Sequence, residues 1–316
     1  MKAIVQDGYG SPDVLKLRDI EKPVVGDDRV LVRVSAASVN AADWHLVRTL
    51  PRVIGRLSRG SVRGFDVAGR VEAVGGKVKG FTPGDEVFGT GNGSFAEYVA
   101  SSEASLAPKP GNLTFEQAAA IPFAGLTAVQ GLRDKADVRP GQRVLIYGAG
   151  GGVGTFAVQI ARWLGASITA VTSTGNLELM RSLGADEVMD YTKEDFTQAG
   201  QRYDVLFDIG ANRSFAECRR VLAPRGVHVL VGAPKRFRTI VWRLLKALAL
   251  SHIARRRVGT LMAGGSHEDL VLLKELAEAG KLSPVIDRRY PLSQVPDAVR
   301  YVGTGEARGK VVINVA

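Results

Sequence analysis

The chain has 316 residues, about twice the usual domain length of roughly 150, which predicts two domains or one domain inserted in another. Hydrophobic residues make up 45% of it and charged residues 23%, values that exclude a disordered, fibrous or disulfide-stapled chain. Lys and Arg number 42 against 32 Asp and Glu, a net charge of +10 whose excess lies in two windows without acidic residues, 44–65 with five Arg and 235–257 with eight basic residues.

Short β-runs separated by Gly and Pro occupy the first part of the chain, to about residue 110, and predict a small, partly open barrel. These runs lie at 2–5, 30–34, 69–74 and 95–99. The period then changes. Thr114-Phe115-Glu116-Gln117 has the spacing of a capping box and begins an Ala-rich helix, and a second helical run follows at 125–135.

Strand-like apolar runs alternate with helical patterns from Gln142 onwards, which is typical of a parallel, doubly wound sheet. The strand-like runs lie at 144–147, 168–172, 188–189, 205–207 and 227–231, and the helical patterns at 153–164, 176–183 and 213–222. The last stretch, 284–316, is expected to return to the first domain. We therefore predict an α/β protein with a doubly wound Rossmann domain over 121–283 and a mostly β, partly open barrel domain formed by 1–120 and 284–316.

A glycine-rich turn joins the first strand of the predicted Rossmann domain to the helix that follows. Five of the seven residues 148–154 are glycine, in the spacing G-x-x-G-x-x-G. Residues without Cβ allow positive φ and let backbone N–H groups contact a pyrophosphate at the helix N-terminus. The position in a strand-turn-helix unit predicts dinucleotide binding. The residues assigned to the dinucleotide are Gly148, Gly151, Gly152, Val153 and Gly154.

The segment after the second strand favours NADPH over NADH. An Asp or Glu about 20 to 25 residues beyond the glycine turn would bind the adenosine ribose of NAD, but residues 172–177 contain no acid. A carboxylate would repel a 2′-phosphate, whereas Ser173 and Asn176 can donate hydrogen bonds to it. No Lys or Arg lies in this turn, so the preference depends on these two side chains.

An ordered set of motifs resembles a known group of proteins. The set comprises Val39-Asn40-Ala41-Ala42-Asp43-Trp44, Gly64-Phe65-Asp66-Val67-Ala68-Gly69, Pro83-Gly84-Asp85-Glu86-Val87, Gly125-Leu126-Thr127-Ala128, the glycine turn and Gly309-Lys310-Val311-Val312. It resembles the medium-chain dehydrogenase/reductase superfamily, and specifically its zinc-independent quinone oxidoreductase (zeta-crystallin-like) branch. The resemblance implies a GroES-like barrel domain, a homodimer, and hydride transfer from NADPH to a quinone or to the activated C=C of an enone or 2-alkenal.

Catalytic zinc is excluded on the identity of the residues. The zinc alcohol dehydrogenases of the superfamily have a Cys where Asn40 stands and a His where Phe65 stands, and neither amide nor phenyl replaces these ligands. Without a metal Lewis acid, simple alcohol oxidation loses the group that stabilises the alkoxide. Reduction of a quinone or enone stays feasible, because conjugation delocalises the charge that hydride addition generates.

Four residues of the first domain are assigned to catalysis. By resemblance, Asn40 lies beside the nicotinamide and the substrate; it is equally suited to cap a short helix over 41–48, with Asp43 at the N3 position. Asp43 and Trp44 would supply a proton relay and an apolar wall, or else an exposed cap carboxylate and a packed indole. Phe65 stands where the zinc enzymes have their His.

Further residues are assigned to the cofactor. By resemblance Thr127 contacts the cofactor. The alternative is that its hydroxyl hydrogen-bonds the backbone of its own helix. Tyr191, after the third strand, is predicted near the adenosine phosphate or, alternatively, partly buried in the core. The positions just past the fourth and fifth strands, where open sheets bind ligands, and the terminal motif add Gly210, Gly232, Ala233 and Lys310.

Two other functions stay open at this point. One is a trans-2-enoyl thioester reductase, which the same branch resembles. The other is a non-catalytic NADPH-binding protein whose window 235–257 forms a basic interfacial helix on an anionic membrane surface. The apolar face of that helix would equally suit packing on its own domain or on a dimer partner. Nucleic-acid binding has no motif to support it.

The remaining features concern location. The single cysteine, Cys218, cannot form an internal disulfide and is predicted to be an inert thiol. The N-terminus has too few apolar residues for a signal peptide, and no uncharged stretch is long enough to cross a membrane. We therefore expect a cytoplasmic protein.

Overall fold

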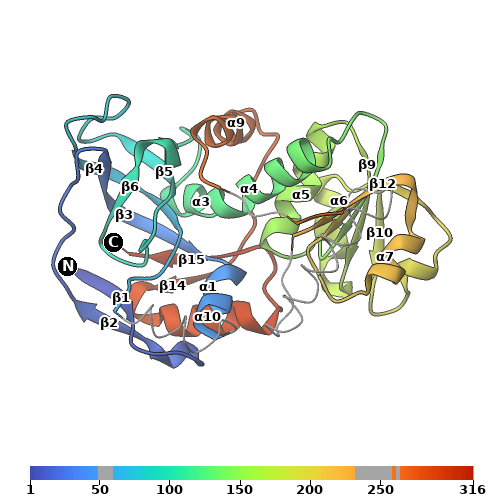
Figure 1. Cartoon of the computed structure of the whole chain (residues 1–316), viewed down its shortest axis with the longest axis horizontal. Coiled ribbons are helices and arrows are strands. Elements are labelled where there is room, and N and C mark those ends of the chain that lie inside the picture. Colours follow the sequence, from blue (N-terminus) through green and yellow to red (C-terminus); the bar gives the residue numbers. More distant parts are fainter. Residues whose placement is uncertain (49–59, 232–257, 261–263, 316) are drawn as a thin grey trace. The chain divides into compact units, whose positions relative to one another are not determined.

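The computed structural model describes residues 1–48, 60–231, 258–260 and 264–315. The chain divides into two compact units, Met1–Leu126 with Gly264–Ala316, and Thr127–Ala263 (Figure 1). The second segment of the first unit begins at Gly264 because helix α9 (His267–Glu278) packs against strand β7 (Leu106–Pro108). The compact units therefore do not coincide with the predicted limits at 120 and 284.

Strand β3 (Arg29–Val39) is the centre of the seven-stranded sheet of the first unit. It pairs antiparallel with β4 (Asp66–Val74), β6 (Tyr98–Ser102) and β15 (Lys310–Asn314). The main order is β14-β15-β3-β4-β5-β7, where β5 is Glu86–Thr90 and β14 is Ile286–Pro291, and a separate hairpin pairs β1 (Lys2–Gln6) with β2 (Leu15–Asp19). This sheet confirms the predicted mostly β, GroES-like domain.

The register of β3 brings residues from distant parts of the chain to one end of the sheet. Ser38 lies opposite Asp66, the first residue of β4, and Val39 lies opposite Val311 in β15. Asn40 directly follows β3, and Lys310 directly precedes Val311. Asn40, Asp66 and Lys310 therefore meet where three strands begin or end.

The described α-helices that lie wholly or partly in this unit are α9 and four others: α1 (Ala41–Arg48), α3 (Phe115–Ala119), α4 (Pro122–Val129) and α10 (Val295–Thr304). The predicted capping box of α3 is confirmed, because Thr114 and Gln117 exchange side-chain and backbone hydrogen bonds. Apolar side chains of α1 and α10 join those of the sheet in one buried cluster that includes Val32, Trp44 and Val299.

The second unit contains a six-stranded, wholly parallel sheet in the order β10-β9-β8-β11-β12-β13. Its strands are β8 (Arg143–Tyr147), β9 (Ser167–Thr172), β10 (Glu187–Asp190), β11 (Tyr203–Asp208), β12 (Leu222–Leu230) and β13 (Val258–Thr260), and its helices include α5 (Gly152–Trp163), α6 (Leu177–Leu183) and α7 (Phe215–Arg220). This arrangement confirms the predicted doubly wound fold. The chain order changes direction at β8, and open sheets bind ligands at such a point, outside the carboxyl ends of the strands.

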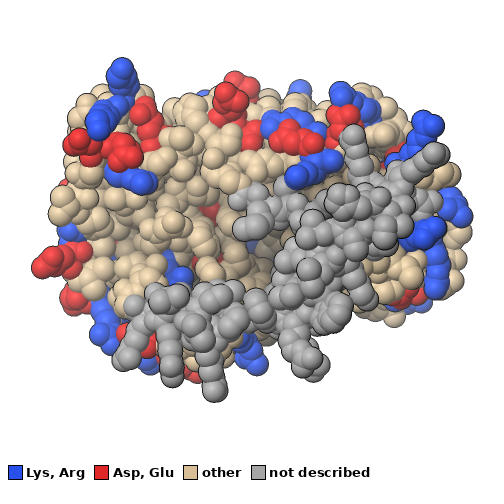
Figure 2. Space-filling view, in the orientation of Figure 1, with Lys and Arg blue, Asp and Glu red and all other residues tan. Residues whose placement is uncertain are grey.

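Charged side chains of both signs are interspersed on the described surface (Figure 2). Exposed ion pairs such as Arg18–Asp7 and Arg70–Glu86 contribute about 0–1 kcal/mol each. The basic window 235–257 and residues 49–59 of the other window lie outside the described residues. In the part of the chain that the structure describes, no helix has the length and hydropathy that a membrane span requires.

Candidate functional site

A buried polar network lies where β3, β4 and β15 meet; we call Asn40, Asp66 and Lys310 the Asn40 network. The ammonium of Lys310 donates to Asn40 Oδ1 at 2.5 Å and to Asp66 Oδ2 at 3.0 Å. Asn40 Nδ2 donates to the same oxygen of Asp66 at 2.9 Å. Asn40 is 6% exposed, Asp66 0% and Lys310 2%. Because an unpaired charge is very costly to bury, each ion of this pair depends on the other.

Two further groups donate to the Asp66 carboxylate. Ser38 Oγ donates to Oδ2 at 2.5 Å, and the backbone N–H of Phe123 donates to Oδ1 at 2.7 Å. Phe123 lies in the first turn of α4, where a backbone N–H has no acceptor within its own helix. Asp66 therefore accepts hydrogen bonds from four residues that are distant in sequence.

The contacts of Asn40 separate the two roles predicted for it. Its side-chain amide is directed to Asp66 and Lys310 instead of capping α1. Asp43, in the first turn of α1, accepts the backbone N–H of Asn40 through Oδ2 at 2.7 Å, which is one half of a capping box. The backbone of Asn40 thus belongs to the helix start, and its side chain belongs to the network.

Asp43 is a buried carboxyl group whose two oxygens differ in their hydrogen bonding. It is 2% exposed, so the predicted exposed cap carboxylate is wrong. Within the described residues its Oδ1 has no hydrogen-bond partner. Burial raises the pKa of Asp43 from 3.8 to about 7; the hydrogen bond from Asn40 opposes this rise, and the charge of Asp66 adds to it. A carboxyl group with a pKa near neutrality is suited to exchange protons.

The two aromatic residues assigned to catalysis differ in their surroundings. Trp44 lies in the core cluster against α10, where a Cβ on Gly303 would come within 2.1 Å of the indole Nε1. These contacts are those of a packed indole. Phe65 is half-buried beside Phe123, with ring centroids 5.7 Å apart. Phe65 therefore keeps part of its ring available to a neighbouring group.

The Asn40 network does not fit a zinc ion. The only strong acceptor of the Asn40 amide, Oδ1, already faces the Lys310 ammonium at 2.5 Å. A divalent cation at this oxygen would meet a second positive charge, and the phenyl ring of Phe65 offers no ligand atom. The chemistry derived for this site therefore contains no metal-assisted step.

The glycine turn after β8 has the geometry that an anion requires. Helix α5 has Gly151 as its N-cap, which provides no side-chain acceptor for the first N–H groups of the helix. A Cβ on Gly154 would lie 2.4 Å from the backbone oxygen of Ala149, and Gly148 has φ +89°, so both positions require glycine. The N–H groups of Gly152, Val153 and Gly154 thus belong to a close turn that favours negative charge.

Asn176 lies behind this turn. It is 7% exposed, and a Cβ on Gly150 would come within 2.5 Å of its Nδ2. Its Nδ2 donates to Ser173 Oγ at 3.2 Å, whereas its Oδ1 is buried without a partner in the described part of the chain. An acceptor without a donor at the edge of a glycine turn fits a ribose hydroxyl better than a phosphate. The predicted contact of Asn176 with a 2′-phosphate stays a prediction.

A carboxylate that the sequence pattern did not predict lies beside the segment 172–177 that follows β9. Asp190 ends β10 and lies opposite Thr172 at the end of β9. Thr174 Oγ1 donates to it at 2.5 Å and Thr192 Oγ1 at 2.7 Å, and these bonds lower the pKa of Asp190. The segment directly after the second strand contains no acid, and Asp190 belongs to the third strand. The pairing of β9 with β10 brings this acid from the next strand.

The other cofactor assignments fall at several places. Gly210 lies beside the glycine turn, because a Cβ on Gly148 would come within 3.0 Å of the Gly210 nitrogen. Tyr191 is 47% exposed directly after β10, so the alternative of a core tyrosine is wrong. Thr127 is 5% exposed in α4. Residues 232–233, Gly232 and Ala233, lie outside the described residues.

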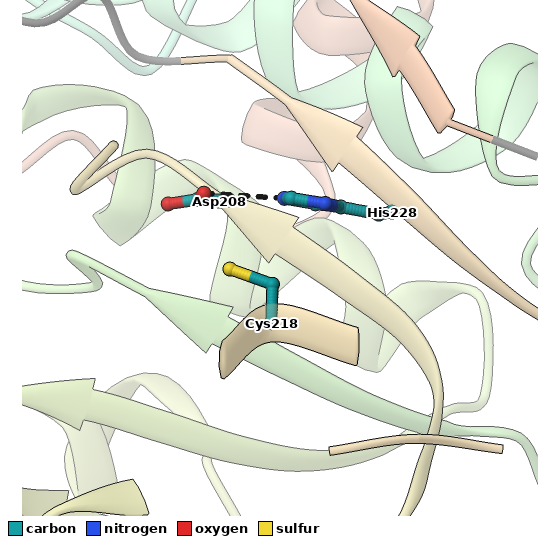
Figure 3. A group of neighbouring side chains, drawn as sticks. All are labelled: Asp208, Cys218 and His228. Carbon is teal, nitrogen blue, oxygen red and sulfur yellow. Dashed lines mark hydrogen bonds and ion pairs between the residues drawn. The ribbon is translucent and has the colours of Figure 1, made fainter. Parts of the chain in front are cut away.

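Asp208, Cys218 and His228 form a buried cluster next to Gly210 (Figure 3). Asp208 ends β11; its Oδ2 lies 3.1 Å from His228 Nε2 in β12, and its Oδ1 accepts the backbone N–H of Ala211 at 2.8 Å. Ala211 has φ +52°, which residues with a Cβ rarely adopt. The thiol of Cys218 points toward this pair from α7. The cluster therefore holds the turn after β11 in a strained conformation.

Comparison with known proteins gives consistent matches over both units. The family descriptions "Alcohol dehydrogenase GroES-like domain" and "Zinc-binding dehydrogenase" match residues 26–111 and 183–313. The chain is 38% identical to the 2-methylene-furan-3-one reductase of Solanum lycopersicum and 37% identical to the NADPH-dependent alkenal/one oxidoreductase of Arabidopsis thaliana, with 99% of this chain and 79% of each relative covered. The quinone oxidoreductase from Coxiella burnetii has a TM-score of 0.89 at 32% identity, covering 100% of this chain and 99% of that one.

Proposed function

Since the chain belongs to the medium-chain dehydrogenase/reductase family, we propose that it is an NADPH-dependent, zinc-independent oxidoreductase that reduces a quinone or the activated C=C of an enone or 2-alkenal. The named relatives are reductases of conjugated carbonyl compounds or quinones. The proposal takes the class of reaction from them and the absence of a metal-assisted step from the residues of this chain.

The observation that carries the proposal is the ammonium of Lys310, 2.5 Å from Asn40 Oδ1. A zinc dehydrogenase would need a cation and its ligands at this position, and here a side-chain cation is already fixed. Without a Lewis acid, the reaction must use an acceptor that delocalises its own developing charge. Quinones and enones meet this requirement, whereas a simple ketone does not.

When bound, NADPH supplies the hydride. The N–H groups of Gly152, Val153 and Gly154 would hold its pyrophosphate at the start of α5, and Gly210, without a side chain, would leave room for the cofactor. The other described residues that we assign to the cofactor are Gly148, Gly151, Asn176, Thr127, Tyr191 and Ser173. Their small, hydroxyl or exposed side chains are suited to bind and orient a dinucleotide.

Asp43 is the proposed source of the proton that completes the reduction. Its pKa of about 7 means that a substantial fraction carries a proton near neutral pH, and its Oδ1 has no other partner among the described residues. We assign Phe65 to an apolar wall beside the acceptor. Trp44 supports α1, on which Asp43 lies, through its packing against Gly303.

The test is NADPH oxidation measured with quinones, 2-alkenals, enoyl-CoA esters and saturated ketones. We expect turnover with quinones or 2-alkenals, none with saturated ketones, and no loss of activity after treatment with a zinc chelator. Faster turnover of enoyl-CoA esters would identify a thioester reductase. Tight NADPH binding without turnover of any acceptor would refute the proposal in favour of a non-catalytic binding protein.

The assembly and location of the protein stay predictions. A quinone or enone is the proposed small-molecule partner, and a homodimer is implied by the family. The membrane contact proposed for 235–257 falls on residues outside those the structure describes. A cytoplasmic location is proposed from the sequence alone.

A further inference from the structure

The Asn40 network determines which way the amide of Asn40 faces. An ammonium group can only donate hydrogen bonds, so the atom 2.5 Å from Lys310 Nζ must be the amide oxygen. The oxygen of Asp66 that Asn40 contacts also accepts from Lys310 and Ser38, so the amide atom 2.9 Å from it must be the nitrogen. An asparagine amide can usually rotate by half a turn at little cost. Here a cation on one side and a carboxyl group on the other oppose that rotation.

The energetics of the ion pair point to orientation rather than stability. Asp66 and Lys310 are 0% and 2% exposed, so both lose nearly all of their hydration. Buried ion pairs often contribute no more stability than well-packed apolar residues of similar size. What an apolar pair could not do is fix the polarity of the amide between them. Asp43, outside this network, also holds Asn40 by accepting its backbone N–H.

The fixed orientation leaves one group of Asn40 for the substrate. Nδ2 carries two hydrogens, and one of them goes to Asp66. Within the described residues, the other hydrogen has no acceptor. A donor, and not an acceptor, is what the reaction requires, because hydride addition to the β-carbon of an enone forms a C–H bond there and moves the π electron pair toward the carbonyl oxygen. That oxygen becomes an enolate, and a proton then adds at the α-carbon.

We propose that Asp66 and Lys310 are positioning residues that hold the Asn40 amide with its Nδ2–H as the donor to the developing enolate oxygen of the acceptor. This inference rests on the proposed function. It adds that the acceptor must carry a carbonyl group, and it gives a reason for the buried ion pair in the first unit. Asn40 is then a catalytic residue, and Lys310 acts through it rather than on the cofactor. Removing one donor of this kind typically lowers kcat by about 100- to 1,000-fold.

The experiment compares Lys310→Met, the charge-neutral double variant Asp66→Asn with Lys310→Met, and Lys310→Arg. Each is measured for kcat and KM with a 2-alkenal, for the Kd of NADPH by fluorescence, and for Tm. Lys109→Met is the matched control, because it removes a largely buried lysine from an ion pair with Glu86 that lies outside the Asn40 network. Should Lys310→Met fail to fold, the double variant, which leaves no unpaired buried charge, keeps the test.

We expect kcat to fall by about 100-fold in the two Met variants with the Kd of NADPH within about twofold of the wild type, and to be partly restored by Lys310→Arg. Lys109→Met should stay within about threefold of the wild-type kcat. An unchanged kcat in a folded Met variant would overturn the inference. A Kd for NADPH raised about tenfold with kcat retained would instead make Lys310 a cofactor ligand.

A second measurement separates this inference from the proposed function. The side-chain amide of Asn40 can be observed by nuclear magnetic resonance and assigned through its loss in Asn40→Ala. In the wild type we expect two strongly inequivalent hydrogens, and in the double variant a shifted and less dispersed pair. If the wild type reduces no acceptor, the proposed function fails, but this comparison still tests whether Asp66 and Lys310 position the Asn40 amide. Identical resonances in the two proteins would reject this positioning role, whatever the activity.

Discussion

The free energy of unfolding of the wild-type protein should fall as the pH rises from 5 to 8, because Asp43 is buried. In Asp43→Asn this fall should be absent. Burial raises the pKa of Asp43 to about 7 from 3.8, so in this range the folded protein keeps a proton that the unfolded chain has already released. Where the folded state binds more protons than the unfolded state, the free energy of unfolding falls with increasing pH. The isosteric amide cannot ionise, and the variant therefore lacks this decline.

The magnitude follows from the two pKa values. One pKa unit corresponds to about 1.4 kcal/mol, and integration between pH 5 and pH 8 gives about 3 kcal/mol for Asp43 alone. The decline begins near pH 4 and levels off above about pH 7, where both states are ionised. For a chain of this length the loss corresponds to about 4 °C in Tm. Titrating groups that do not interact with Asp43 are common to both proteins and cancel in the difference.

The assay is thermal and urea unfolding of the wild type and Asp43→Asn at half-unit pH steps, followed by circular dichroism. Asp19→Asn, which removes an exposed carboxyl group, is the control for loss of charge. A second reading is the rate of reduction: a protonated Asp43 that donates a proton gives a rate that falls as the pH rises through about 7, and Asp43→Asn should lose that limb. A difference in stability between the two proteins that is flat from pH 5 to pH 8 would refute the reasoning.

Four more substitutions test the cofactor side. Gly154→Ala should lower the Tm and weaken NADPH binding, because its Cβ would lie 2.4 Å from a backbone oxygen. Gly151→Ala, with 3.7 Å to the nearest atom, should fold normally and raise the Kd of NADPH about tenfold. An unchanged Kd would show that Gly151 is not part of the site. Ser173→Asp should shift the ratio of the NADPH and NADH dissociation constants toward NADH by about tenfold, and an unchanged ratio would show that Ser173 does not face the 2′-phosphate. Asp208→Asn should weaken NADPH binding by loosening the strained turn at Ala211, and full affinity in a destabilised variant would confine Asp208 to a structural role.

Local sequence patterns sufficed for the features that depend on neighbouring residues. The capping box at Thr114 and the glycine turn after β8 were predictable because a helix start and a strand-turn-helix unit are built from residues a few positions apart. The identities of Asn40 and Phe65 were enough to exclude zinc ligation at those positions, since ligand chemistry belongs to the residue type. The alternation of strands and helices predicted the parallel sheet for the same reason.

The tertiary structure decided everything that depends on strand pairing. Lys310 and Asn40 are 270 positions apart, and Lys310 and Asp66 are 244 apart, so no spacing rule connects them. Their meeting depends on the register of β15 and β4 against β3. In the same way, the pairing of β10 with β9 brings Asp190 beside the segment that follows β9. The sequence by itself determined the fold class, the nucleotide turn and the lack of zinc ligands, because these are local or compositional. The burial of Asp43, the polarity of the Asn40 amide and the partner of Lys310 were decided only in the folded chain, because desolvation and non-local hydrogen bonds exist only there.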